Sequence, residues 1–211
     1  MNVPFRIIGD VHGIYSQYIN LIKKADFSVQ LGDMGFEYGS LDNVDSLCHR
    51  FVPGNHENYP NLPPHAFQAD WGQVSMGVLD FVYIRGAYSV DKMYRIEGRN
   101  WFSEEEMTWP SGYQLVEAIA MLQPKYILSH DCPTVCLDNG VTTNEWKIRP
   151  SHTSQILQAV WEVWQPDHWI FGHHHHNWIK QIERTRFTCL DSLSSLDIFP
   201  EDGKMVVNKF F

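Results

Sequence analysis

The sequence predicts an α/β fold, and two observations support this prediction. Short apolar runs typical of buried strands alternate along the chain with segments whose apolar residues recur at helical spacing. Five of the apolar runs end in glycine or serine, and a polar side chain that can bind a metal follows each of them. Since 44% of the 211 residues are hydrophobic and 19% are charged, the chain can bury a sizeable core, which excludes disorder and a coiled coil.

In the first half of the chain, strands and helices are expected to alternate. Tyr18, Leu21 and Ile22 are spaced so that they share one face of a helix. The expected strands are 5–8, 27–31, 50–52 and 81–85. The expected helices are 14–25 and 41–49.

The second half is expected to continue this alternation. Ser103 followed by Glu106 has the spacing of a capping box and predicts the start of a helix. Helical spacing then extends over 112–123, where Pro124 ends it. The expected strands are 125–129, 168–171 and several short ones over 178–211.

Charge and hydropathy exclude several classes of protein. The formal net charge, 16 − 25 = −9, disfavours long duplex nucleic acid as a partner, because such binding needs Lys and Arg on the phosphates. The first residues lack an apolar segment of secretory-signal length, and no run approaches the ~18 apolar residues of a membrane span. We therefore expect a cytoplasmic protein with free thiols and no membrane partner, organised as one domain over 1–211.

The five polar strand ends bring potential metal ligands together. In α/β proteins, ligands gather beyond the carboxyl ends of strands, so these ends are expected to surround one crevice. Asp10 and His12 are two residues apart, as are His173 and His175, and on an extended segment each pair points the same way. The segments are GDVHG at 9–13, GDMG at 32–35, GNHE at 54–57, SHDCP at 129–133 and GHHHH at 172–176.

Seven side chains in these segments form the predicted ligand set. The carboxylate of Asp33 has two oxygens and can bridge two cations, which gives two four-ligand sites that share it. Mixed imidazole and carboxylate ligands suit Mn, Fe or Zn better than Ca. The set is Asp10, His12, Asp33, Asn55, His130, His173 and His175.

In their order the segments resemble the calcineurin-like metallophosphoesterases, whose motifs run D-x-H, GD, GNH, a lone His and GHxH. The resemblance implies two packed mixed β-sheets flanked by helices, with the metal site at the carboxyl ends of the strands. His56 would be a catalytic residue that faces the substrate without binding metal. The first metal would take Asp10, His12, Asp33 and His175. The second would take Asp33, Asn55, His130 and His173.

The activity implied by the resemblance is hydrolysis of a phosphate ester by a metal-bridging hydroxide. Two divalent cations bring +4 against −2 from Asp10 and Asp33 and −1 from the hydroxide, so the site attracts phosphate. Such a pair activates water at neutral pH and clamps an in-line displacement, while His56 protonates the leaving oxygen or binds the phosphoryl group. Manganese is the cofactor expected in vitro, with iron or zinc possible. The expected substrate is a small phosphomonoester or phosphodiester resembling a nucleotide.

The segment after Asp33 departs from the G-D-x-x-D-R-G pattern of the family's Ser/Thr protein phosphatases. Phe36 and Glu37 stand where that pattern has Asp and Arg. A protein phosphatase is therefore kept as an alternative function, beside a non-catalytic binding module of the same fold. The partner that orients His56 is left open between Glu37 and a backbone carbonyl.

The stretch 86–107 is also open to two interpretations. It is either a lid that supplies Arg and aromatic side chains to the substrate or a loop packed on the sheet. Arg85 is the candidate substrate-binding residue, because it lies at a strand end.

Several residues beside the ligand set have no assigned role. Asp131 either supports its neighbouring ligand or is a loop carboxylate. Cys132 and Cys136 are expected to be unreactive thiols. His174 and His176 are expected to point away from the metals, because they alternate with the ligands.

Overall fold

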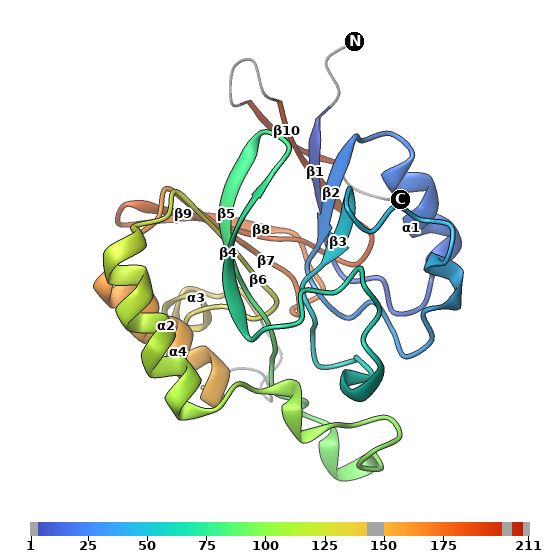
Figure 1. The fold of residues 1–211 in the computed structure, drawn as a ribbon. Helices are drawn as coiled ribbons and strands as arrows, with labels where there is room; N and C mark the ends of the chain where they lie inside the picture. Colours follow the sequence, from blue (N-terminus) through green and yellow to red (C-terminus); the bar gives the residue numbers. More distant parts are fainter. Residues whose placement is uncertain (1–3, 143–149, 200–203, 209–211) are drawn as a thin grey trace.

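The computed structural model describes residues 4–142, 150–199 and 204–208, in which strands and helices alternate (Figure 1). The strands are β1 (Phe5–Ile8), β2 (Phe27–Gln30), β3 (His49–Phe51), β4 (Trp71–Met76), β5 (Leu79–Ile84), β6 (Tyr126–Ser129), β7 (His168–Phe171), β8 (Trp178–Ile182), β9 (Thr185–Cys189), β10 (Ser195–Ile198) and β11 (Met205–Asn208). The helices are α1 (Tyr15–Ile22), α2 (Trp109–Leu122), α3 (Thr134–Asp138) and α4 (His152–Val163).

These strands form two mixed sheets. The first has the order β11-β10-β1-β2-β3, in which β1, β2 and β3 are parallel and the other neighbours are antiparallel. The second has the order β4-β5-β6-β7-β9-β8, in which β5, β6, β7 and β9 are parallel and the two edge strands are antiparallel. The predicted fold class, two mixed sheets flanked by helices, is confirmed.

Alternation along β1 divides the core into layers. Phe5 and Ile7 pack in the same cluster as Phe81 of β5, so this face of the strand lies between the two sheets. Ile8 points the other way and packs in the cluster that contains Tyr18 of α1. One face of the first sheet therefore meets the second sheet, and the other is covered by α1.

Helices α2 and α4 lie side by side on the outer face of the second sheet (Figure 1). Trp169 of β7 packs there with Leu115 of α2 and Ile156 of α4. Gly112 allows the close approach of the two helices, since a Cβ at this position would lie 2.7 Å from the side chain of Ile156. No helix in the described part of the chain has the length and apolarity that a membrane crossing requires.

The predicted helix over 41–49 is wrong. The chain forms a 3-10 turn over Gly39–Leu41 and further turns before β3 begins at His49. Asp45 explains part of the difference, because its carboxylate accepts a hydrogen bond from the backbone N–H of Leu47 at 2.8 Å. Such local side-chain bonds compete with the helical hydrogen-bond pattern.

The predicted helix start at Ser103 is also wrong. Residues Ser103–Glu105 form a 3-10 turn, and α2 begins only at Trp109, with Thr108 as its N-cap. Glu106 does not complete a capping box, because its carboxylate accepts hydrogen bonds from the backbone and hydroxyl of Thr153, at 2.9 and 3.2 Å.

Other elements agree with the expected positions or were not predicted. The expected strands over 5–8, 27–31, 81–85, 125–129 and 168–171 correspond to β1, β2, β5, β6 and β7. The tail contains four short strands, although residues 200–203 and 209–211 of it lie outside the described residues. Strand β4 and helices α3 and α4 were not anticipated.

Candidate metal centre

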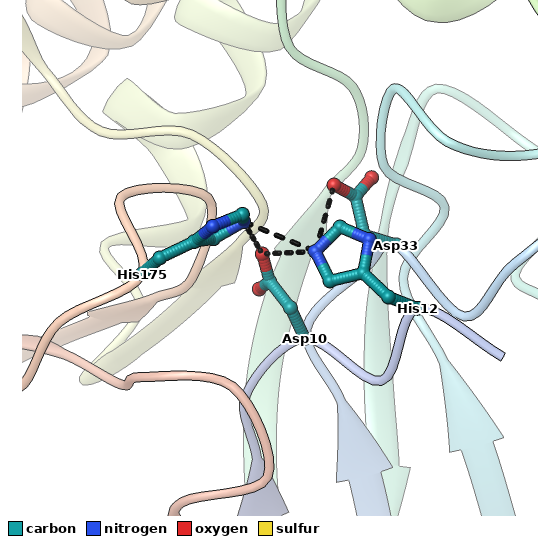
Figure 2. Close-up of side chains that lie close together, drawn as sticks. All are labelled: Asp10, His12, Asp33 and His175. Carbon is teal, nitrogen blue, oxygen red and sulfur yellow. Dashed lines mark hydrogen bonds and ion pairs between the residues drawn. The ribbon is translucent and has the colours of Figure 1, made fainter. Parts of the chain in front are cut away.

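The carboxyl ends of β1 and β2 bring three predicted ligands together, and the loop after β7 adds a fourth (Figure 2). We call Asp10, His12, Asp33 and His175 the first cluster. Nε2 of His175 lies 3.0 Å from Nε2 of His12 and 3.0 Å from Oδ2 of Asp10. Nε2 of His12 lies 3.6 Å from Oδ2 of Asp10 and 3.8 Å from Oδ2 of Asp33.

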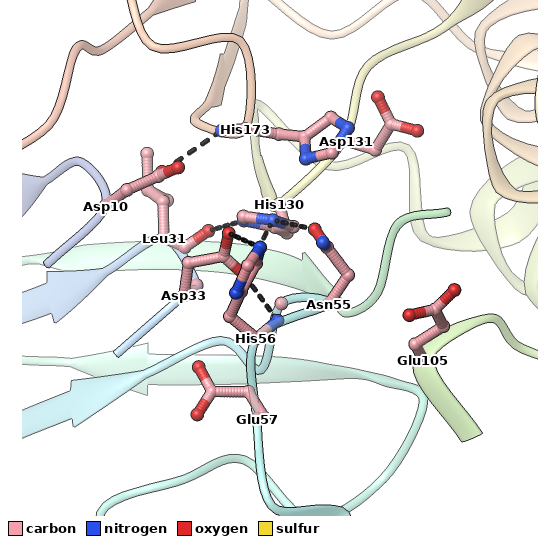
Figure 3. A network of polar contacts seen from close by, with 12 residues as sticks. Asp10, Leu31, Asp33, Asn55, His56, Glu57, Glu105, His130, Asp131 and His173 are labelled. Carbon is pink, nitrogen blue, oxygen red and sulfur yellow. Dashed lines mark hydrogen bonds and ion pairs between the residues drawn. The ribbon is translucent and has the colours of Figure 1, made fainter. Parts of the chain in front are cut away.

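A second cluster lies on the other side of Asp33 and is formed by Asp33, Asn55, His130 and His173 (Figure 3). Nε2 of His130 lies 3.3 Å from Oδ1 of Asp33 and 3.1 Å from Oδ1 of Asn55. The two oxygens of Asp33 therefore face different clusters. All seven predicted ligands are found in these two groups.

The donor atoms of both clusters fit bound cations. Nδ1 of His130 lies 2.7 Å from the carbonyl oxygen of Leu31, which can only accept, so Nδ1 is a donor and Nε2 is directed at the oxygens of Asp33 and Asn55, where it holds a proton in the metal-free protein and would present a lone pair to a bound cation. In the first cluster, Oδ2 of Asp10 is buried and accepts no hydrogen bond of normal geometry from the described residues. Lone pairs that converge in this way repel one another unless a cation or a proton lies between them.

The backbone of the ligands is strained. His12, Asp33, His173 and His175 have φ values of 48°, 56°, 64° and 55°, in the left-handed region that L-residues rarely adopt. Strain of this kind persists where the surrounding structure imposes it, and it concentrates at functional sites. The turn after each strand thus directs its side chains into the centre at a conformational cost.

The glycines of the motifs make room for the ligands. A Cβ on Gly54 would lie 2.4 Å from Oδ1 of Asp33, and a Cβ on Gly172 would lie 2.3 Å from Oδ1 of Asp10. The side chain of a ligand that follows one strand therefore fills the space beside the glycine at the end of another strand. This close approach explains why glycine precedes Asn55 and His173.

Buried charges hold the carboxylates ionised. Burial raises the pKa of Asp10, but the imidazoles of His12 and His175, whose Nε2 atoms lie 3.6 and 3.0 Å from Oδ2, outweigh this effect and bring that pKa well below its usual value. The pKa of Asp33 is also well below its usual value, because the charge of His130 and a hydrogen bond with it outweigh burial. Burial lowers the pKa of His130, but Asp33 reverses the effect and raises it to about 9 in the metal-free protein.

His56 lies beside both clusters. Its backbone N–H donates to Oδ1 of Asp33 at 2.8 Å, and its ring packs edge-on against His12 with the centroids 5.1 Å apart. Within the described residues, the hydrogen-bond partner of the ring is Arg95, whose Nη2 lies 2.6 Å from Nε2 of His56, rather than Glu37. Burial lowers the pKa of His56, and the charge of Arg95 adds to this against the opposing charge of Asp33.

Arg95 was not singled out by the sequence. Asp91 holds its guanidinium at 2.7 Å, and both residues line a cavity of about 300 Å³ together with Asp33, Asn55 and His56. The hypothesis of a lid over 86–107 did not say which arginine of that stretch would contact the substrate, and no sequence motif marks Arg95. Arg95 and His56 lie 39 residues apart in the sequence, so no local pattern could pair them.

The structure does not bring Arg85 into the clusters. Its guanidinium is paired with Asp70 and lies 4.7 Å from the ring centroid of Tyr59. Nothing tests its predicted role in substrate binding, which stays a prediction.

A buried relay fixes the amide of Asn55. Its Nδ2 donates to Oγ of Ser89 at 3.1 Å, and this hydroxyl donates to Oε2 of Glu105 at 2.6 Å. The backbone N–H of Ser89 also donates to Glu105, at 2.9 Å. Because Ser89 occupies the donor end of the amide, Oδ1 of Asn55 is directed toward His130. No local sequence pattern marks this relay.

Glu57, the last residue of the GNHE segment, supports the loop that carries Asp33. Its carboxyl group accepts hydrogen bonds from the backbone N–H of Met34 and the hydroxyl of Tyr38, both at 2.7 Å. Burial, together with the charge of Asp33, raises the pKa of Glu57 well above its usual value.

Comparison with known proteins identifies the family of this chain. The sequence profile of the calcineurin-like phosphoesterase family matches residues 3–177. A search among curated proteins gives no match.

Solved structures of low sequence identity share the fold. A dimetal phosphatase from Danio rerio is 14% identical, with a TM-score of 0.60 over 98% of this chain and 95% of that one. A putative 5'-nucleotidase from Staphylococcus aureus is 12% identical, with a TM-score of 0.56 over 99% of this chain, which spans 53% of the nucleotidase. A phosphopantetheinyl hydrolase from Mycobacterium tuberculosis is 10% identical, with a TM-score of 0.53 over 90% of each chain. Because the family profile matches most of the sequence, and the motif residues converge as its chemistry requires, this chain belongs to the calcineurin-like phosphoesterase family.

Proposed function

We propose that this protein hydrolyses small phosphate esters, monoesters or diesters of nucleotide-like size, at a centre that holds two divalent metals. The observation that carries the proposal is the position of Asp33, with Oδ1 toward His130 and Oδ2 toward His12. A carboxylate placed in this way can bridge two cations. The first cluster would hold one of them and the second cluster the other, with manganese, iron or zinc as the candidates.

When bound, two such cations supply Lewis-acid polarisation of the phosphoryl group and activate water at neutral pH. The residues of this chain then position the ester. His56 lies within 3.9 Å of Asp33 through Nε2, at the edge of the cavity, where a leaving oxygen could receive its hydrogen bond. In the substrate-free protein Arg95 donates to Nε2 of His56, so Nε2 becomes available to the leaving oxygen only when Arg95 is drawn away from it.

Arg95 supplies a cation that the motif itself lacks. Glu37 occupies the position at which protein phosphatases of the family carry an arginine, whereas Arg95 reaches the same catalytic histidine from a distant loop. We propose that a bound phosphate competes with His56 and Asp91 for this guanidinium. This arrangement disfavours the mode of phosphate binding used by protein phosphatases and suits a small ester that fits the cavity.

The test is hydrolysis of p-nitrophenyl phosphate and bis-p-nitrophenyl phosphate, measured side by side. Metal-stripped protein is reloaded with Mn, Fe, Zn or Mg in turn. We expect turnover that requires added metal, and the preferred ester identifies the substrate class: monoester preference points to phosphorylated metabolites and nucleotides, and diester preference to cyclic nucleotides or nucleic-acid ends.

A folded Asp33→Asn variant is the control, because it removes the proposed bridge with little change in shape. Metal-dependent turnover in the wild type that this variant lacks supports the proposal. Absence of turnover on both esters in a protein with both clusters loaded would contradict it and favour a non-catalytic binding module.

A further inference from the structure

A third group of ligating side chains lies beside the second cluster. We call Asp131, Cys132 and His174 the thiol cluster. Nε2 of His174 lies 3.2 Å from Sγ of Cys132 and 3.4 Å from Oδ1 of Asp131. All three residues are buried, with 4%, 0% and 7% of their surface exposed for Asp131, Cys132 and His174.

The thiol cluster and the second cluster lie back to back. Asp131 directly follows His130, and His174 directly follows His173. At each of these two strand ends, the first residue belongs to the second cluster and the next one to the thiol cluster. The ring centroids of His173 and His174 are 5.1 Å apart. In Figure 3 the carboxylate of Asp131 is turned away from Asp33 and His130.

Two of the donor separations lie near those of tetrahedral zinc. Sulfur at about 2.3 Å from zinc, with nitrogen and oxygen at about 2.0–2.2 Å, places neighbouring ligand atoms about 3.4–3.6 Å apart in a tetrahedron. The observed separations of 3.2 and 3.4 Å fall close to this range. The ligand types also differ from those of the first two clusters, since a thiolate favours soft or borderline cations.

Hydrogen bonding alone accounts poorly for this arrangement. If Nε2 of His174 is unprotonated, it accepts from the thiol of Cys132 but faces the carboxylate of Asp131 with a lone pair. If it is protonated, its single N–H is shared between a sulfur and an oxygen. A divalent cation satisfies all three donors, and its charge of +2 is balanced by one thiolate and one carboxylate, which leaves a neutral group in the interior.

The cluster has an access path. Asp131 and His174 line a cavity of about 440 Å³ together with Ser151, whose hydroxyl donates to the other oxygen of Asp131 at 3.2 Å.

We infer that Asp131, Cys132 and His174 form a third metal site, of the zinc class, with three protein ligands and solvent from the cavity as the fourth. The site joins the turns after β6 and β7, the same turns that present His130 and His173 to the second cluster. A cation bound there would fix these turns and stabilise the fold around the candidate dinuclear centre.

Cobalt(II) provides a direct test, because a thiolate ligand gives a charge-transfer absorption in the near ultraviolet that imidazole and carboxylate ligands do not. Metal-stripped protein is titrated with Co²⁺ while absorbance and bound cobalt per chain are measured. We expect the thiolate band to develop and the bound cobalt to exceed the two ions of the first and second clusters. Zinc added afterwards should displace the band.

Cys132→Ser should lose the band and bind one cobalt fewer, and His174→Gln serves as a second variant if that protein does not fold. Cys136→Ser is the matched control, because Cys136 is a buried cysteine of the same core that lies outside the thiol cluster. The thiolate band should persist in the Cys136→Ser variant.

A wild-type protein that shows no thiolate band at saturating cobalt would overturn the third site, as would a band that survives Cys132→Ser. The readout needs no substrate and is therefore independent of the proposed hydrolysis. A band in a protein without turnover would leave the third site standing, and turnover without a band would refute the third site alone.

Discussion

The two halves of the candidate metal centre differ in how they are held. In the first cluster, the side chains of His12 and His175 are 28% and 46% exposed, and their ring nitrogens contact each other and the carboxylates. In the second cluster, the side chain of His130 is fully buried and fixed by the carbonyl of Leu31, while Ser89 fixes the amide of Asn55.

This difference predicts different metal behaviour. Exposed ligands with few supporting bonds leave the first cluster open to solvent and to exchange of its cation. Buried ligands held by hydrogen bonds keep the second cluster organised before its cation arrives, since such supporting bonds orient the ligands and raise affinity. We therefore expect the cation of the first cluster to exchange faster than that of the second.

Asp33→Asn should impair both halves of the metal centre, because both clusters use this carboxylate. We expect weakened binding of both cations and a loss in kcat/KM of about 10⁴-fold or more, since each cation contributes several kcal/mol and about 1.4 kcal/mol corresponds to a factor of ten. Metal content and kcat/KM on a nitrophenyl ester would measure the effect. A variant that retains both cations and turnover would refute the bridge.

His56→Ala should lower kcat by roughly 10²–10⁴ if the imidazole protonates the leaving group. The loss should shrink for esters with good leaving groups, which need no proton. A series of substituted phenyl phosphates measures this dependence. Equal losses across the series would exclude the acid role and favour a hydrogen bond to the phosphoryl group.

Ser89→Ala should affect the second half only. Without the hydroxyl, the amide of Asn55 loses its fixed orientation, and we expect about 10–100-fold weaker binding of one cation. Equilibrium metal titration gives the two affinities separately. Ser103→Ala is the control. Within the described residues, the hydroxyl of Ser103 donates a hydrogen bond to the exposed side chain of Glu104 and has no contact with Asn55. Equal weakening of both cations would show that the halves are not held independently.

Arg95→Ala should raise KM by about tenfold, because one charge-assisted hydrogen bond to the phosphate is lost. The effect should be larger for the dianionic monoester than for the monoanionic diester. Arg99→Ala, an exposed arginine of the same loop, is the matched control and should leave KM unchanged. A similar KM for both variants would contradict a phosphate contact by Arg95.

The smallest effect concerns the pH dependence of the metal-free protein. Because Asp33 raises the pKa of His130 from 6.5 to about 9, the protonated ring stabilises the fold fully below pH 6.5, and this contribution is lost as pH rises through about 9. Urea unfolding from pH 6 to 10 measures the free energy of unfolding. We expect a decline over this window that His130→Gln abolishes and that saturating metal suppresses, because a bound cation replaces the proton.

Local patterns predicted much of the centre. Asp10, Asp33, Asn55, His130 and His173 each follow a short apolar strand, and parallel strands bring their carboxyl ends to one edge. Where side chains compete locally with the backbone, the pattern failed, as it did for the helix expected over 41–49. The ligand assignments and the identity of the metals stay predictions.

The sequence by itself determined the α/β class and the family, and it predicted which side chains meet at the strand ends, because strand periodicity and strand-end motifs depend on residues close together in the chain. Only the tertiary structure decided that Arg95 meets His56, that Ser89 holds Asn55, and that Cys132 faces His174. These pairs are separated by 39, 34 and 42 residues, and no local spacing encodes them. They arise from the packing of the loop 86–107 and the turns after β6 and β7 around the centre, which depends on the whole core.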